Sequence, residues 1–204
     1  MKRRSGQSRN LLKRGLILCE GETEENYFKG LVNDNKHRDK FASISVDIYK
    51  PKNHSPTGLV EEAKDRIKEA RRERNEYDFI WIVFDKDGHE NIPKAFNDAS
   101  SYGTRINIAF TVICFEFFVL LHFEKTMSPF RNCKALIKEL KKHLPDYEKA
   151  SNLYVELKDR MEEGIRNGKW SFQQVRFQLE SGKMPYELSA FSNVHQLVEF
   201  LFKL

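Results

Sequence analysis

The chain of 204 residues lacks any apolar run approaching the roughly 20 residues that a helix needs to cross a bilayer. Its basic start is not followed by an apolar stretch, so we expect no signal peptide. It also lacks the Gly-rich loop of the Walker type, which argues against ATP hydrolysis by the chain itself. Internal repeats and low-complexity linkers are absent too. These absences favour a globular, cytoplasmic protein without a membrane partner.

Cysteine is scarce, and its pattern is uninformative about metals. Cys19, Cys114 and Cys133 are odd in number, scattered and without the spacing of a zinc site. We therefore predict reduced thiols that mostly fill the core of a cytosolic protein.

The composition that is present suits a folded domain with a mildly basic surface. Apolar residues make up 40% and charged residues 32%, and the net charge is +5 with a pI of about 9.0. This excess is compatible with a polyanionic partner without proving one. Basic residues gather at the start of the chain, without an acid among the first fourteen: Lys2, Arg3, Arg4, Arg9, Lys13 and Arg14. This arm can lie on phosphates, with Lys13 and Arg14 as contacts, or it can be a solvated terminus.

The first 125 residues alternate between strand and helix patterns. Hydrophobic or alternating runs predict strands at 16–19, 43–49, 78–84 and 106–111, and 78–84 is the expected central strand. Each strand is followed by a helix pattern; Thr23 is the expected cap of the first helix, and Gly103 ends the third. This order predicts an α/β fold with a mostly parallel sheet and helices on both faces.

The last third of the chain has a different pattern. From about residue 130 we expect no strands, but helices over 132–144, 151–167 and 192–204, with 168–190 unassigned. The predicted organisation is a basic, flexible arm over 1–13, a metal-binding α/β domain over 14–125, and a helical C-terminal extension over 126–204 packed on that core.

Three carboxylates follow the two most hydrophobic strands of the predicted sheet. Glu20 comes directly after strand 16–19, and Asp85 and Asp87 come directly after strand 78–84. In open α/β sheets, ligand sites lie beyond the carboxyl ends of the strands, so these acids can meet at one edge. Crowded carboxylates repel each other, and a hard divalent cation such as Mg²⁺ or Mn²⁺ relieves the repulsion. The sequence thus predicts a metal site of Glu20, Asp85 and Asp87, although each acid alone could be an ordinary loop residue.

These acids also carry a resemblance to known proteins. A Glu-Gly after one hydrophobic strand and an Asp-x-Asp after a later one resemble the Toprim fold of topoisomerases, primases and overcoming-lysogenization-defect nucleases. In that fold the Glu and the Asp-x-Asp bind the metal. The resemblance assigns this role to Glu20, Asp85 and Asp87.

The chain is more closely similar to the RloB-like family, also called AbiLii-like, through four ordered motifs. They are Cys19-Glu20-Gly21-Glu22-Thr23-Glu24-Glu25-Asn26-Tyr27-Phe28, Phe84-Asp85-Lys86-Asp87, Cys114-Phe115-Glu116-Phe117-Phe118-Val119-Leu120-Leu121-His122-Phe123 and Asn193-Val194-His195-Gln196-Leu197-Val198. Departures are one residue fewer between Gly21 and Thr23, Phe118 in place of Trp, Val112-Ile113 in place of Asn-Pro, and a shortened last motif. The resemblance implies an anti-phage, abortive-infection effector nuclease encoded beside an ATPase of the AAA or ABC type.

Further candidates accompany the acids. Glu116 in the buried 115–123 helix needs a partner, either the metal cluster or a Lys or Arg, and is a candidate catalytic residue. His122, six positions on, is either a core histidine or a second-layer residue that orients a ligand or shuttles a proton. Glu24 sits in the first turn of a helix, which explains it by the helix dipole, and is also a candidate behind the metal ligands. Lys86 can touch phosphate. His89 can contact the leaving group, or be exposed without a role.

The remaining polar candidates are weaker. Glu22 could be an outer ligand, and Lys52 and His54, in the loop after strand 43–49, could contact phosphate. For His195 we expect a structural role in the last helix.

We therefore expect an Mg²⁺-dependent endonuclease acting on RNA such as tRNA, or on DNA. The alternative is a non-catalytic binding or regulatory subunit of the ATPase, and a weaker one is nucleotidyl transfer or nucleotide hydrolysis at the same metal site. A homo-oligomer is compatible with either function.

Overall fold

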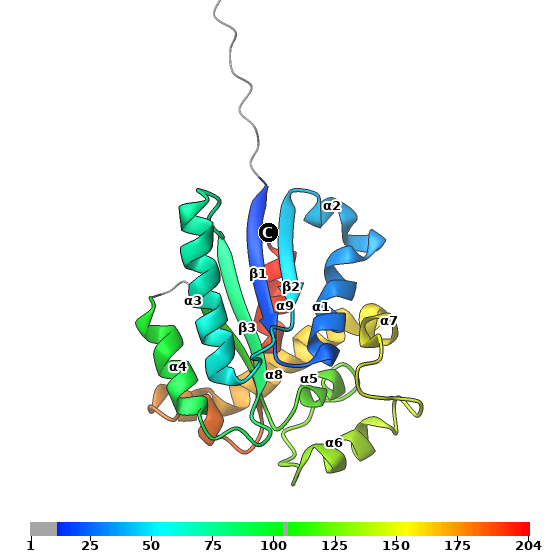
Figure 1. The fold of residues 1–204 in the computed structure, drawn as a ribbon. Coiled ribbons are helices and arrows are strands. Elements are labelled where there is room, and N and C mark those ends of the chain that lie inside the picture. Colours follow the sequence, from blue (N-terminus) through cyan, green and yellow to red (C-terminus); the bar gives the residue numbers. More distant parts are fainter. Residues whose placement is uncertain (1–11, 104–105) are drawn as a thin grey trace, which may run out of the picture.

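The computed structural model describes residues 12–103 and 106–204, so the predicted basic arm lies outside the described residues up to residue 11. Its centre is a five-stranded sheet in the order β2–β1–β3–β4–β5 (Figure 1). The strands are Lys13–Cys19 (β1), Ile44–Tyr49 (β2), Phe79–Asp85 (β3), Asn107–Val112 (β4) and Phe191–Ser192 (β5). Strands β1 to β4 are parallel and β5 is antiparallel. The predicted α/β fold with a mostly parallel sheet is confirmed, and β3 is the central strand.

Helices cover both faces of the sheet. Their bounds are Glu22–Asn33 (α1), Arg38–Phe41 (α2), Pro56–Arg72 (α3), Ile92–Ser101 (α4), Glu116–Leu120 (α5), Cys133–Leu140 (α6), Leu153–Leu157 (α7), Met161–Glu180 (α8) and Val194–Phe202 (α9). Short 3₁₀ turns lie at Asn35–His37, Lys158–Arg160 and Pro185–Glu187. None of the helices in the two described stretches combines the length and the apolar character that a membrane span requires.

Alternate residues of the strands divide the core into two clusters. Ile17, Trp81 and Val83 point to one face, where buried residues of α1, α5, α6, α7 and α9 pack against them. Their neighbours Leu18 and Ile82 point to the other face, against α3 and α4. Figure 1 shows α3 and α4 on one side of the sheet and α1 on the other. Burial on both faces explains why β1 and β3 are continuous apolar runs.

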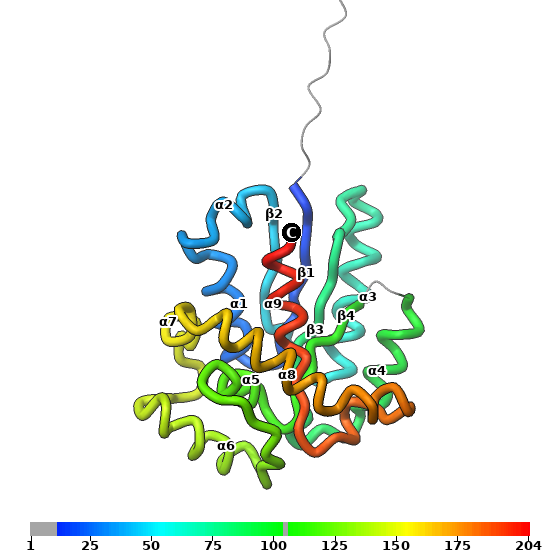
Figure 2. The backbone as a smooth tube through the Cα atoms, turned by 180° about the vertical axis from the view of Figure 1, so that it is seen from behind, coloured from blue at the N-terminus to red at the C-terminus, as the bar shows by residue number. Residues whose placement is uncertain are grey.

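The C-terminal third differs from the prediction in two respects. The expectation that strands stop near residue 130 is wrong, because Phe191–Ser192 pair with β4 as the antiparallel edge strand. The unassigned segment 168–190 is mostly helix α8, which runs across the molecule from the α7 side to the α4 side (Figure 2). A two-residue strand is too short to produce an alternating pattern, so the sequence carries no strand signal there.

Helix α8 fits closely against two buried histidines. A Cβ placed on Gly164 would lie 2.6 Å from the ring of His122, and one on Gly168 would lie 2.7 Å from His195. Burial lowers the pKa of both histidines to about 4, so both are neutral core residues. The structural role expected for His195 fits this placement. His122 packs beside Tyr27 and Phe118, and its Nδ1–H donates to the Phe118 carbonyl, 3.0 Å away.

Candidate functional site

The ends of β1 and β3 bring two of the predicted acids into contact. The strands are parallel neighbours, and the Glu20 amide donates to the Val83 carbonyl at 2.9 Å. The backbone N–H of Asp85 donates to Glu20 Oε2 at 3.0 Å. Glu20 and Asp85, which are 65 positions apart, therefore meet at the carboxyl edge of the sheet, as the position of the two strand ends predicts.

A tight turn after β3 places the rest of the acidic motif. The Asp87 amide donates to Asp85 Oδ1 at 2.9 Å, and Gly88 has a φ of +74°, a conformation that glycine adopts without a steric cost. The turn leads the chain back so that His89 Nε2 hydrogen-bonds Glu20 Oε1. His89 is thus half-buried against a predicted metal ligand, and the alternative of an exposed histidine without contacts is wrong.

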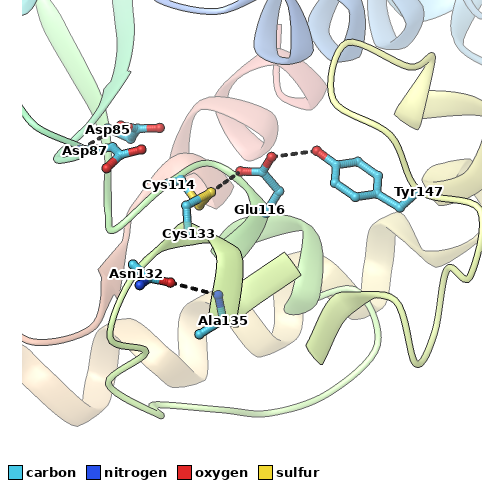
Figure 3. Close-up of a disulfide and its surroundings, with 8 residues drawn as sticks. All are labelled: Asp85, Asp87, Cys114, Glu116, Asn132, Cys133, Ala135 and Tyr147. Carbon is cyan, nitrogen blue, oxygen red and sulfur yellow. Dashed lines mark hydrogen bonds between the residues drawn. A yellow bond between two sulfur atoms is a disulfide. The ribbon is translucent and has the colours of Figure 1, made fainter. Parts of the chain in front are cut away.

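A cleft of about 350 Å³ opens at this edge, and acids dominate its lining. Six acidic residues line it, together with two lysines and one histidine. They are Glu20, Glu22, Glu24, Asp85, Asp87 and Glu116, with Lys50, Lys149 and His54. They come from the ends of β1, β2 and β3, from α1 and α5, and from the chain after α6. In Figure 3, Asp85 and Asp87 lie on one side of the disulfide and Glu116 on the other.

Glu24 is the most deeply buried of the α1 acids in the cleft. Its Oε2 atom lies against the backbone of Gly21, 2.4 Å from where a Cβ on Gly21 would stand. Burial raises the pKa of Glu24 to about 7, and the charges of Glu20 and Glu116 add to the shift. Burial likewise raises the pKa of Asp85 well above its usual value, with further contributions from Glu20 and Glu24. The cleft is short of positive charge.

Thr23 does not cap α1, contrary to the prediction. The helix begins at Glu22, its N-cap is Gly21, and the Thr23 hydroxyl instead accepts a hydrogen bond from the Ala150 amide at 3.1 Å. Thr23 consequently ties the start of α1 to the chain after α6.

Glu116 lines the cleft beside the other acids, which agrees with the first of its two expected surroundings. The side chain is 2% exposed, and Tyr147 Oη donates to its Oε1 atom at 2.6 Å. Cys133 Sγ lies 3.6 Å from Oε2 (Figure 3). A tyrosine hydroxyl, and not a Lys or Arg, therefore satisfies this buried carboxylate.

The prediction of three reduced cysteines is also wrong. Cys114 and Cys133 form a disulfide, while Cys19 is a free, buried thiol. Cys114 and Cys133 are 19 residues apart, and their spacing alone does not indicate a pair. Packing of α6 on the loop before α5 brings the two sulfurs together.

Glu20, Asp85 and Asp87 lie at the same edge of the sheet, but their oxygen atoms are not close enough together to form a metal-ligand set. Within residues 12–103 and 106–204, the group of His, Cys, Asp or Glu ligand atoms that all lie within 4.8 Å of one another is Cys114, Glu116 and Cys133. Asp87 is exposed, so its side chain can rotate at little cost to join Glu20 and Asp85. The oxygen donors are of the kind that Mg²⁺ and Mn²⁺ prefer. Burial first, and then the neighbouring carboxylates, raise the pKa of Glu24 and Asp85, and a bound cation would offset the cost of ionising them.

Several predicted contacts lie elsewhere. Lys86 is exposed and does not line the cleft. Lys13 and Arg14 begin β1, at the opposite end of the strand from Glu20, and the Arg14 guanidinium contacts Asp47 and Tyr77. His122 also lies outside the cleft lining, in the core.

Sequence reasoning missed three residues at the cleft: Lys50, Tyr147 and Lys149. Lys50 directly follows β2, and its ammonium lies 3.9 Å from Glu22. Since β2 is the parallel neighbour of β1, its carboxyl end had to reach the same edge, and that signal was available for Lys50. Tyr147 and Lys149 lie in an irregular segment, where sequence gives no direction.

Fold and site together define an α/β protein with a carboxylate cluster at the carboxyl edge of a mostly parallel sheet. A family model described as RloB-like protein matches residues 15–201, so the chain belongs to the RloB-like family. The comparison with curated proteins yields no match, and neither does the comparison with solved structures.

Proposed function

We propose that the protein is an Mg²⁺-dependent endonuclease that acts as the effector of an anti-phage defence system. The observation that supports this most is the contact between Glu20 and Asp85 at the sheet edge, in a cleft where burial and like charges raise the pKa of Asp85 and Glu24. Carboxyl groups with raised pKa values in a cleft are frequent at functional sites. Membership of the RloB-like family agrees with the proposal.

Glu20, Asp85 and Asp87 would hold the metal. When bound, Mg²⁺ supplies polarisation of a phosphoryl oxygen and a more acidic water for in-line attack. Glu20 is oriented by the Asp85 amide on one oxygen and by His89 on the other. Asp87, at the mouth of the cleft, completes the oxygen donors.

Basic residues at the cleft would orient the nucleic acid. Lys50, His54 and Lys149 line the cleft beside the acids, and each can donate to a phosphate. Glu116 is buried and its orientation is fixed by the hydrogen bond from Tyr147. Its carboxylate would line the bottom of the site and could accept a proton there. An ATPase partner of the AAA or ABC type would restrain this activity, and the substrate class is RNA such as tRNA, or DNA.

The direct test is incubation of the purified chain with Mg²⁺ and tRNA, single-stranded RNA and duplex DNA. We expect cleavage of at least one substrate, its loss with a chelator, and its loss in Asp85→Ala. Asp47→Asn is the matched control, because Asp47 is a carboxylate that pairs with Arg14 outside the cleft. Equal cleavage by Asp85→Ala and the unaltered protein would refute the mechanism.

One observation favours the alternative, a non-catalytic subunit of the ATPase. His89 and the Asp85 amide together occupy both oxygens of Glu20, so the acids could serve only to order the turn after β3. A stoichiometric complex with the ATPase that persists in Asp85→Ala, with no cleavage of any substrate, would support this reading.

A further inference from the structure

The disulfide joins the loop before α5, which leads directly to Glu116 in the cleft, to the start of α6, whose chain reaches the cleft later at Lys149 and Ala150. Cys114 lies in the loop between β4 and α5, two residues before Glu116, and Cys133 is the first residue of α6. Figure 3 shows the bond beside Glu116, whose Oε2 atom lies 3.6 Å from Cys133 Sγ. A change at this bond therefore acts directly on the surroundings of the cleft.

The chain that leaves α6 returns to the cleft, where Lys149 and Ala150 line it, while α6 itself packs in the core through Leu136 and Leu140. We name residues 133–150 the cleft wall. Tyr147 donates to Glu116 at 2.6 Å, and Ala150 donates through its amide to Thr23 and accepts from Asn26 at 3.0 Å. Ala150 has a φ of +64°, a costly conformation for a residue with a Cβ, so these bonds hold it in place.

The state of the sulfurs also changes the bonding of Glu116. Cys133 Sγ lies 3.6 Å from Glu116 Oε2, within reach of a thiol hydrogen bond. A thiol at this position donates to the carboxylate, whereas a disulfide sulfur has no proton to donate. Reduction therefore gives Glu116 a second donor beside Tyr147, and oxidation removes it.

We propose that Cys114 and Cys133 form a reversible redox modification site that fixes the cleft wall when oxidised and frees it when reduced. The oxidant would be a peroxide: the two thiols lose two protons and two electrons to form the S–S bond, and hydrogen peroxide takes them up as its O–O bond breaks to give two waters. A small dithiol reverses the reaction and leaves as a cyclic disulfide. Cys133 is the less buried of the two residues, 7% exposed against 1% for Cys114. Control of activity by this site rests on the proposed function; its formation does not.

The test uses the full chain, reduced with a phosphine and then treated with hydrogen peroxide. Peptide mapping should find Cys114 linked to Cys133 after oxidation and both free after reduction. Amide hydrogen exchange over 133–150 should be slower in the oxidised chain, on the order of tenfold, and thermal unfolding should shift upward by roughly 5 °C. Cys133→Ala should abolish both differences, and Cys19→Ala, which removes the free thiol in β1, should preserve them.

Three results would overturn the proposal. The first is absence of the Cys114–Cys133 link after peroxide treatment. The second is equal exchange over 133–150 in both states. The third is stoichiometric zinc in the purified chain that protects both thiols from alkylation, since Cys114, Glu116 and Cys133 would then be a metal site. Asp85→Ala should keep the redox difference, so loss of the nuclease function and loss of the redox site are told apart.

Discussion

Charged side chains are paired with opposite charges at the amino end of the sheet and clustered with like charges at its carboxyl end. At the amino end, in the space between β2 and α3, each arginine is matched: Arg14 contacts Asp47 at 3.2 Å and lies over the Tyr77 ring at 4.1 Å, and Arg66 contacts Glu62 at 3.0 Å. At the carboxyl end, Glu20, Asp85 and their neighbours crowd like charges into one cleft. The first arrangement stabilises the fold, and the second costs stability.

Size does not distinguish these regions, but charge balance does. The hollow at the amino end, about 440 Å³, is larger than the acidic cleft of about 350 Å³. In the hollow at the amino end, both arginines are already paired with carboxylates of the chain, so no ligand is needed to neutralise them. In the acidic cleft, ionising the carboxyl groups costs free energy, and a bound cation would offset that cost. Four substitutions can break or sharpen this comparison.

Asp85→Asn should have the largest effect on activity. It removes a candidate ligand and one charge from the cleft, so we expect cleavage to fall on the order of 100-fold or more while the free energy of unfolding at neutral pH rises. Initial rates with Mg²⁺ and urea unfolding without it measure the two quantities. A variant that loses both activity and stability would contradict the assignment of Asp85 as a strained functional acid.

Glu24→Gln tests the cost of the buried carboxyl. The pKa of Glu24 is about 7 in the folded chain, against 4.5 for an unperturbed glutamate, so the folded state binds more protons between these values. The unaltered protein should therefore lose stability as pH rises from about 4.5 to 7. Without divalent cations, Glu24→Gln should match it at pH 4 and exceed it at pH 8, by about 1 to 3 kcal/mol. Parallel stability curves would show that Glu24 ionises freely.

Arg14→Ala tests the balanced end. It removes the contacts with Asp47, Tyr77 and the Asn75 carbonyl, and we expect a loss of about 1 to 2 kcal/mol in the free energy of unfolding, since such half-exposed contacts are individually weak. Cleavage per folded molecule should not change. A selective loss of activity, measured at a temperature where the variant is folded, would mean that Arg14 contacts the substrate as the sequence suggested.

Lys149→Met should have the smallest effect. Lys149 lowers the pKa of Glu24 and lines the cleft. If it contacts one phosphate, the slope of log affinity against log salt should fall by about 1, with a several-fold loss of affinity. Fluorescence anisotropy with labelled tRNA at several salt concentrations measures the slope. An unchanged slope would place the nucleic acid away from this side of the cleft.

The parts of the fold that rest on long patterns could be read from the sequence. Strands β1 and β3 are apolar because they are covered on both faces, and their order along the chain places Glu20 and Asp85 at the same edge. The Asp-x-Asp motif gave the third acid. These features depend on local periodicity and on the direction of parallel strands.

Other features depend on contacts that no local pattern encodes. The pairing of Phe191–Ser192 with β4, the Cys114–Cys133 bond and the Tyr147 partner of Glu116 each join segments separated by 19 residues or more. The contact between His89 and Glu20 depends on the turn at Gly88, whose positive φ leads the chain back towards Glu20. Such pairings are fixed by the packing of the C-terminal third on the sheet.

The most direct test of the central claim is a crystal structure grown with Mn²⁺, with anomalous scattering used to locate the ion. The account predicts an ion between Glu20 and Asp85 at the carboxyl edge of the sheet, with Asp87 rotated towards it and His89 displaced or retained on Glu20. An ion bound only at Cys114, Glu116 and Cys133, or no ion at the sheet edge at millimolar Mn²⁺, would contradict it.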